Sequence, residues 1–142
     1  MLAPDTQHAS TEPWSPYGMR TSLDRSAFLV DLMGAAERAG LVIDQLHTEY
    51  GHDQLEVALA PTTPVAAADE VILARIVIGR AAARHGLKIS FSPVPFAGEA
   101  GNGAHLHLSL ADDDGPVLSG GGGPHGMRPA GHGIPVPEPR LP

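Results

Sequence analysis

The sequence contains no cysteine among its 142 residues, and aromatic side chains make up only 4% of it. Without cysteine, the chain has no disulfide framework, no thiolate nucleophile and no cysteine-ligated zinc site. Lysine and arginine are also few, 9 against 16 acidic residues, which gives a formal net charge of −7. This charge argues against non-specific nucleic-acid binding and against a polybasic membrane anchor, because both need a basic surface.

Long apolar runs are absent as well. No stretch approaches the roughly 20 residues of a membrane span, and residues 1–13 lack the apolar core of a signal peptide. Hydrophobic residues still make up 42% of the chain, so a folded core is possible. We therefore expect a soluble cytoplasmic protein with neither a nucleic-acid nor a membrane partner.

Glycine and proline are abundant, with 17 and 14 residues, and they gather toward the C-terminal end. Residues 1–13 are polar and are expected to form a flexible arm. Residues 14–123 carry the periodic segments and are assigned to one domain. Residues 124–142 have no apolar periodicity and are expected to form a Pro/Gly-rich irregular tail.

Two segments have the spacing of amphipathic helices. The first follows a turn at residues 14–18, is expected to be capped by Ser22 or Asp24, and ends where Gly40 can adopt a left-handed conformation. The second starts with Thr63 as the capping candidate and ends at Gly86. The stripe of this second helix that is expected to face the core comprises Ile72, Ile76, Gly79 and Ala83, broadened by Val65, Ala68 and Ala82.

Four segments are predicted as strands: residues 41–47, 54–61, the start of 87–95, and 105–110. In the second of these, Leu55, Val57 and Leu59 alternate with polar or small residues and are expected to face the core. The order helix–strand–strand–helix–strand–strand indicates an α+β fold, with a largely antiparallel sheet and helices packed on one face.

The strand predicted at residues 105–110 places His105, His107 and Ser109 at alternate positions, with leucines between them facing the core. Alternate side chains on a strand lie about 6.6–7 Å apart and point the same way. The two imidazoles can therefore hold one ion or serve two neighbouring ligands. The alternative is that this polar face is simply exposed to solvent.

The stretch "EYGHDQLE" places Glu49 at the end of one predicted strand and Glu56 on the polar face of the next, beside Gln54. If the strands pair, both carboxylates meet on one face, and their repulsion favours a cation between them. Oxygen ligands of this kind suit Mg²⁺ or Mn²⁺. The alternative is two solvated glutamates. No role is assigned to His47, His52 or His85.

The Gly-rich loop at residues 98–104 leads into a predicted strand and not into a helix. It is therefore neither a P-loop nor a dinucleotide-binding motif, since both need a helix N-terminus to receive phosphate. Its glycines let backbone approach a ligand closely, although an ordinary flexible loop has the same composition.

Taken together, "EYGHDQLE" and "GNGAHLHLSL" resemble the E-x-x-x-x-Q-x-E segment and the Gly-rich loop followed by H-x-H-x-S of the glutamine synthetase family. The resemblance extends over about residues 14–123. It implies a catalytic domain with a curved, largely antiparallel sheet that forms a funnel for two divalent cations, Mg²⁺ or Mn²⁺. The implied reaction is ATP-dependent ligation of ammonia to the γ-carboxylate of glutamate through γ-glutamyl phosphate.

By position, the resemblance implies that Glu49 and Glu56 bind the metal on the substrate side and that His105 binds the metal near the ATP phosphates. His107 and Ser109 are implied to contact the nucleotide. The backbone of Gly101 is implied to receive glutamate.

Two departures from the family pattern bear on the amine that is used. Val94 stands where lysine is frequent, and Ala100 replaces a common asparagine. A ligase for a polyamine or another amine therefore fits as an alternative to the ammonia enzyme.

The family's N-terminal β domain, its early E-x-E pair and its late arginines and glutamate have no counterpart here. We expect a truncated fragment that is inactive alone, whose tail arose by a frameshift, from a family whose full-length members form homo-oligomers. Two hypotheses of another class are a hydrolytic zinc site formed by His105, His107 and a carboxylate, and a non-catalytic piece that joins subunits of a relative.

Overall fold

The computed structural model describes residues 2–3 and 14–132, and the chain divides into two compact units, residues 1–103 and 104–142. The boundary falls after Gly103, inside the range that the sequence analysis assigned to one domain. Of the expected flexible arm, residues 2–3 form a short strand, and residues 4–13 lie outside the described residues.

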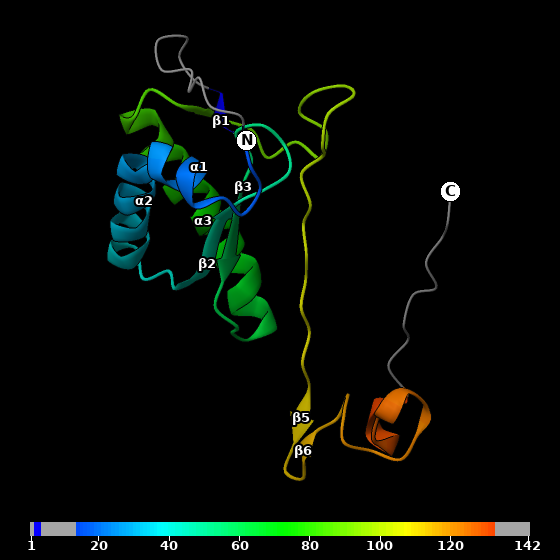
Figure 1. Ribbon diagram of the computed structural model, residues 1–142. Coiled ribbons are helices and arrows are strands. Elements are labelled where there is room, and N and C mark those ends of the chain that lie inside the picture. Colours follow the sequence, from blue (N-terminus) through cyan, green and yellow to red (C-terminus); the bar gives the residue numbers. More distant parts are fainter. Residues whose placement is uncertain (1, 4–13, 133–142) are drawn as a thin grey trace. The chain divides into compact units, whose positions relative to one another are not determined.

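Among its described residues, the first unit contains three helices and four strands, and Figure 1 shows the chain in sequence colours. They are β1 (Leu2–Ala3), α1 (Met19–Asp24), α2 (Ser26–Arg38), β2 (Ile43–Thr48), β3 (Leu55–Leu59), α3 (Pro64–Arg84) and β4 (Lys88–Ile89). β2 pairs with β3 and β1 pairs with β4, both antiparallel. Mixed helices and antiparallel strands confirm the predicted α+β class.

The core of the first unit lies between α2, α3 and the β2–β3 hairpin. Its most buried residues are Phe28, Leu32 and Ala36 of α2, Leu41, and Ala74, Val77, Ala81 and Ala82 of α3. Alanines at the contact let the two helices approach closely. The β3 residues Leu55, Val57 and Leu59 pack against this core, as their alternation predicts.

The main residues of the predicted core stripe of α3 were wrong, although Ala82 at its edge is buried. Ile72 is 59% exposed and Ile76 is 53% exposed, while Ala74, Val77 and Ala81 face the core. The predicted stripe mixed large and small residues, whereas a neighbouring face of three alanines and one valine packs in the core with α2. Hydrophobicity alone does not identify a helix face when apolar residues surround the helix.

Both helix ends at glycine are confirmed. Gly40 has φ 76° and Gly86 has φ 67°. The N–H of Leu41 donates to Ala36 O at 2.9 Å, and that of Leu87 donates to Ala82 O at 2.9 Å. These bonds complete Schellman motifs at the ends of α2 and α3.

The N-terminal cap of the first predicted helix differs from the expectation. Ser22 and Asp24 lie within the short α1, and the chain breaks at Arg25 before α2 begins at Ser26. No side chain caps α2, so the choice between Ser22 and Asp24 was wrong. Thr63 does precede α3, but its side chain makes no capping hydrogen bond.

Asp31 of α2 ties this helix to the end of α3. Its Oδ2 lies 2.9 Å from Arg84 Nη2 and 3.2 Å from His85 Nε2. Partial burial alone would raise the pKa of Asp31, but hydrogen bonds and charge from Arg84 and His85 outweigh it and lower that pKa. His85 at the helix C-terminus also complements the helix dipole.

The second unit begins with an extended segment that leads into the hairpin of β5 (Ala111–Asp112) and β6 (Gly115–Pro116). Two short 3₁₀ turns follow at Pro124–Gly126 and Pro129–Gly131. Arg128 connects this region to the hairpin, since Nη1 donates to Asp112 Oδ1 at 2.6 Å and to Gly115 O at 3.0 Å. The hydrogen bond from Arg128 lowers the pKa of Asp112. Residues 133–142 of the predicted tail lie outside the described residues.

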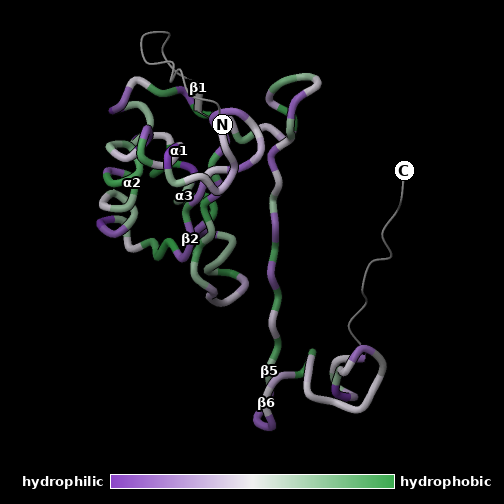
Figure 2. Tube along the Cα trace, viewed as in Figure 1, coloured by the Kyte–Doolittle hydropathy of each residue, from purple (hydrophilic) through white to green (hydrophobic). Residues whose placement is uncertain are grey.

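The strand predicted at residues 105–110 does not form. These residues have no strand pairing, and Leu106, Leu108 and Leu110 are 84%, 54% and 39% exposed instead of facing a core. Figure 2 shows the alternation of hydrophobic and hydrophilic residues along this extended segment. Alternation specifies which residues share a face, but a strand forms only where a neighbouring strand supplies hydrogen bonds.

Within residues 2–3 and 14–132, no helix combines the length and the apolar character that crossing a bilayer requires.

Replacing Leu32 by alanine tests the α2–α3 core, because Leu32 is only 1% exposed. We expect Leu32→Ala to lower the free energy of unfolding by about 2–5 kcal/mol, measured by urea denaturation. Val30→Ala, on the same helix at a residue that is 72% exposed, is the matched control and should change it by less than about 0.5 kcal/mol. Equal losses in the two variants would contradict this description of the core.

Candidate functional site

The β2–β3 hairpin brings three potential metal ligands to one face. His47 lies directly opposite Glu56 in the antiparallel register. Glu49 follows β2 two residues after His47, so it lies on the same side of the extended backbone. The backbone N–H of Glu49 donates to Gln54 O at 2.9 Å, which closes the loop between the strands. The pairing of residues 41–47 with 54–61 thus occurs as the sequence predicts.

The ligand atoms of His47, Glu49 and Glu56 lie within 4.8 Å of one another, and among the described residues they form the one group of three with this spacing. His47 Nδ1 lies 3.4 Å from Glu49 Oε1. This nitrogen is buried and forms no hydrogen bond, so apart from the nearby Glu49 carboxylate nothing compensates its desolvation. Two carboxylates and one imidazole nitrogen are a donor set that fits a divalent cation.

The turn at residues 14–18 holds the end of β2 in place. The indole N–H of Trp14 donates to the carbonyl of Glu49 at 2.7 Å, and the N–H of Tyr17 donates to the carbonyl of Thr48 at 2.9 Å. The fully buried Thr48 donates its hydroxyl to Ser15 O at 3.1 Å. These contacts fix the backbone from which the Glu49 side chain projects.

Tyr17 also contacts the carboxylate itself. Its hydroxyl donates to Glu49 Oε1 at 2.7 Å, and its ring lies 4.9 Å from the His47 ring, centroid to centroid. The hydrogen bond to Glu49, with smaller effects of burial and nearby negative charge, raises the pKa of Tyr17 to about 12. Tyr17 therefore acts as a neutral donor that orients Glu49 at all physiological pH values.

A buried carboxylate, that of Asp53, anchors the loop between β2 and β3. Asp53 is 1% exposed, adopts φ 57°, and pairs with Arg25 at the break between α1 and α2. Its other oxygen lies 3.3 Å from His52 Nδ1. Aspartate tolerates this left-handed conformation better than most residues. The pair with Arg25 keeps the loop that carries Glu49 and Gln54 against the helices.

The Gly-rich loop of the first unit contacts the hairpin through Gln54. The Gln54 Nε2 group donates to Gly101 O at 2.9 Å and to Asn102 Oδ1 at 3.0 Å. A Cβ on Gly101 would lie 2.8 Å from Pro93 O, so glycine is required there for packing. This requirement is independent of any substrate, and the implied glutamate contact of Gly101 stays a prediction.

The implied nucleotide residues lie in the second unit. His105, His107 and Ser109 are all exposed and belong to the extended segment before β5. An extended backbone places alternate side chains on one side, so the three share a side. Their roles, and the metal roles of Glu49 and Glu56, stay predictions.

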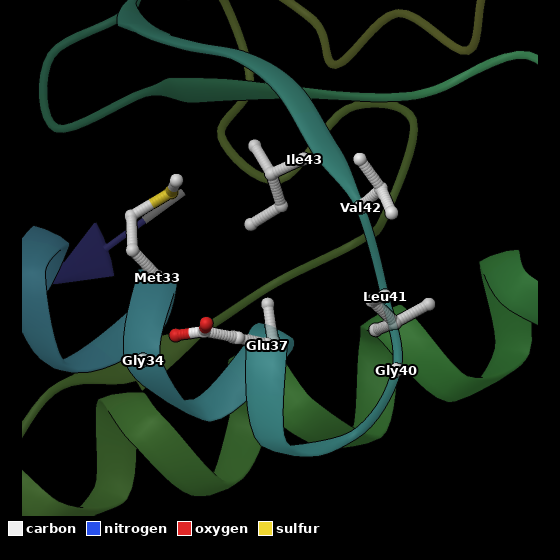
Figure 3. Close-up of a pocket in the computed structure, with 8 residues that line it drawn as sticks. Met33, Gly34, Glu37, Gly40, Leu41, Val42 and Ile43 are labelled. Atoms are coloured by element: carbon white, nitrogen blue, oxygen red, sulfur yellow. The ribbon is translucent and has the colours of Figure 1, made fainter.

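An open groove of about 400 Å³ is not lined by His47, Glu49 or Glu56. It runs between the end of α2 and the start of β2, where Met33 and Glu37 lie across from Ile43 (Figure 3). Its lining is mostly apolar and includes one ionisable side chain, Glu37. The groove therefore offers no cluster of groups for catalysis.

Three residues of the candidate site were missed in the sequence. Trp14 and Tyr17 were noted only as part of a turn, and His47 was given no role. The spacing His47-x-Glu49 on a predicted strand indicates a shared face and could have identified His47. The contacts of Trp14 and Tyr17 with Thr48 and Glu49 span 31 to 35 residues, so no local sequence pattern indicates them.

Comparison with known proteins gives consistent matches. The model of the glutamine synthetase catalytic domain matches residues 3–133. A gamma-glutamylpolyamine synthetase from Streptomyces coelicolor is 42% identical over 106 residues, which are 75% of this chain and 22% of that protein. A glutamate–isopropylamine ligase from a Pseudomonas species is 29% identical over 131 residues, 89% of this chain and 28% of that protein.

Solved structures give the same result. A novel glutamine synthase homolog superposes with a TM-score of 0.78 and 33% identity, covering 86% of this chain and 29% of the other. A GmaS/ADP complex has a TM-score of 0.73 and 25% identity, covering 90% and 31%. The chain thus spans about a fifth to a third of the length of the relatives that it matches.

The Tyr17–Glu49 hydrogen bond can be measured by titrating the phenol. In a Tyr50→Phe background, the absorbance of ionised Tyr17 should rise with a midpoint near pH 12, and Glu49→Gln should move the midpoint down toward 10. Because the folded pKa is the higher one, the stabilising effect of this bond is complete below pH 10 and lost between pH 10 and 12. A midpoint near 10 with Glu49 intact, in protein still folded by circular dichroism, would exclude the bond.

Proposed function

The chain belongs to the glutamine synthetase family. We therefore propose that it contains the glutamate-binding part of a site that uses ATP and metal ions to join an amine to the γ-carboxylate of glutamate. Family members are ligases and generally use ATP and divalent metals. The observation that supports the proposal best is the convergence of His47, Glu49 and Glu56 on one face of the β2–β3 hairpin.

Glu49 and Glu56 would bind Mg²⁺ or Mn²⁺, with His47 as a third donor. The carboxylates supply the hard oxygen ligands that these ions prefer. His47 Nδ1, which makes no hydrogen bond, would bind the metal ion in this arrangement. That bond would offset the free-energy cost of burying this nitrogen. Tyr17 and Trp14 contribute by holding Glu49 in orientation before the ion arrives.

The proposed chemistry explains why these residue types are needed. A carboxylate is a poor acceptor for an amine, so its oxygen first attacks the terminal phosphate of ATP to give γ-glutamyl phosphate and ADP. The amine then displaces phosphate and forms the amide. A bound divalent cation offsets the negative charge that accumulates when a carboxylate approaches a phosphate.

On the nucleotide side, His105 would bind the second metal, and His107 and Ser109 would contact ATP. The support is their H-x-H-x-S spacing, their exposure, and the ADP bound by a solved relative of 25% identity. Gly101 would receive glutamate through its backbone.

The amine is proposed to be ammonia, with a polyamine or another primary amine as the alternative, and the long matches to two amine ligases support that alternative. The gamma-glutamylpolyamine synthetase and the isopropylamine ligase match 75% and 89% of the chain, whereas the glutamine synthetase of Pyrococcus woesei matches 57%. Val94 and Ala100 depart from the pattern in the same part of the chain, Val94 before the Gly-rich loop and Ala100 within it.

Metal binding is the first test of the proposal. We expect Mn²⁺ to bind the chain with one strong site, measured by electron paramagnetic resonance of free Mn²⁺. The double variant Glu49→Gln, Glu56→Gln should weaken that site by about 10-fold or more. The double variant Glu37→Gln, Glu70→Gln makes the same charge change on α2 and α3 and should leave the affinity unchanged. Equal affinity in both double variants would remove the metal assignment.

Phosphate release is the second test. With Mg²⁺, ATP, glutamate and either ammonia or putrescine, the chain alone should release no phosphate above background, since it spans 22–32% of its relatives. Turnover would contradict the expectation that the rest of the site is needed, and faster turnover with putrescine would identify a substituted amine as the acceptor.

A further inference from the structure

We propose that Gln54 is a positioning residue that sets the Gly-rich loop, and with it Gly101, at a defined place relative to the candidate metal ligands Glu49 and Glu56. This inference rests on the proposed function, because it assigns Gln54 the task of coupling the two halves of that site. It concerns only the first unit of the chain, which contains all of these residues.

The carboxamide of Gln54 is buried and fully engaged. Gln54 is 7% exposed, and its Oε1 accepts a hydrogen bond from the N–H of Gly51 at 2.8 Å. Its two Nε2 hydrogens go to Gly101 O at 2.9 Å and to Asn102 Oδ1 at 3.0 Å. An uncharged amide is the side chain that provides one acceptor and two donors from the same end.

Hydrogen bonds to Glu49 and Gly51 also fix the backbone of Gln54. Its carbonyl accepts the N–H of Glu49 at 2.9 Å, and its own N–H donates to Gly51 O at 2.9 Å. Glu56 follows two residues later on β3 and shares the face of the strand with Gln54. A displacement of Gln54 therefore displaces the carboxylates on both sides of it.

The other end of the connection is equally ordered. Asn102 donates its backbone N–H to Pro93 O at 2.8 Å, and its Nδ2 donates to Ser92 O at 2.8 Å and to Ser90 O at 3.3 Å. The short approach of Gly101 to Pro93 O leaves no room for a side chain there. The loop is thus a folded unit, and Gln54 is its side-chain connection to the hairpin.

If Gln54 only stabilised the loop between β2 and β3, its hydrogen bond with Gly51 would be sufficient. The two remaining bonds of Gln54 instead cross to residues 47 and 48 positions away, in the second of the two sequence motifs. Because coupling between two sites is reciprocal, a cation held by Glu49 and Glu56 should make the Gly-rich loop more ordered, and an ordered loop should favour the cation.

Amide hydrogen exchange of the loop, followed by mass spectrometry on the whole chain with and without Mn²⁺, tests this coupling. Gln54→Glu keeps the shape and the acceptor for Gly51 but removes both donors. Without metal, we expect exchange in residues 98–102 to become about 10-fold faster in this variant. Gln45→Glu makes the same chemical change at an exposed residue of β2 and should leave the loop unchanged.

The measurements with Mn²⁺ distinguish a positioning role of Gln54 from a general effect on the stability of the fold. Mn²⁺ should slow exchange of the loop in the parent chain and in Gln45→Glu, but not in Gln54→Glu, although all three still bind Mn²⁺. Core amides of α2 and α3 serve as the control for global unfolding. Gln54→Met removes both donors without adding a charge and should give the same result if Gln54→Glu does not fold.

Unchanged loop exchange in both Gln54→Glu and Gln54→Met without metal would overturn the proposal. Metal-induced slowing that persists in these variants would also overturn it. If the parent chain does not bind Mn²⁺, the proposed function fails and so does the coupling, while the metal-free comparison still decides whether Gln54 holds the loop.

Discussion

The pairing of β2 with β3 is the constraint on which the candidate site depends. The register that sets His47 opposite Glu56 turns the polar side chains to one face and Leu55 and Val57 to the core. A slip of one residue would bury Glu56 and expose both apolar residues, so the burial of the hydrophobic face fixes the position of the candidate site residues. The free energy of the core thereby maintains a cluster of like charges that would otherwise separate.

Two further segments complete the arrangement by polar contacts. In the turn at residues 14–18, the Trp14 indole and the Tyr17 hydroxyl donate hydrogen bonds to Glu49. In the Gly-rich loop, the carbonyl of Gly101 accepts a hydrogen bond from Gln54. Each contact joins residues 32 or more positions apart. The hairpin therefore presents the carboxylates, while distant parts of the chain orient them. Contacts of this kind hold a side chain in one orientation before anything binds to it.

Local features of the fold were predictable because their causes are local. Alternation identified the buried face of β3, and Gly40 and Gly86 marked the helix ends because each adopts a positive φ. The face of α3 was predicted wrongly, since apolar residues such as Ile76 surround the helix and packing selects among them. The segment at residues 105–110 has the pattern of a strand, but pairing depends on a neighbour that alternation cannot supply.

The sequence by itself determined the family, through two motifs, and it identified Glu49 and Glu56 as residues of one face once their strands pair. Residue types and spacing carry that information because period-2 alternation is a property of the local backbone. Only the tertiary structure decided that His47 joins the carboxylates, that Tyr17 donates to Glu49, and that Gln54 reaches the Gly-rich loop. These contacts follow from the packing of segments far apart in the chain, and no spacing in the sequence encodes a distance of that kind.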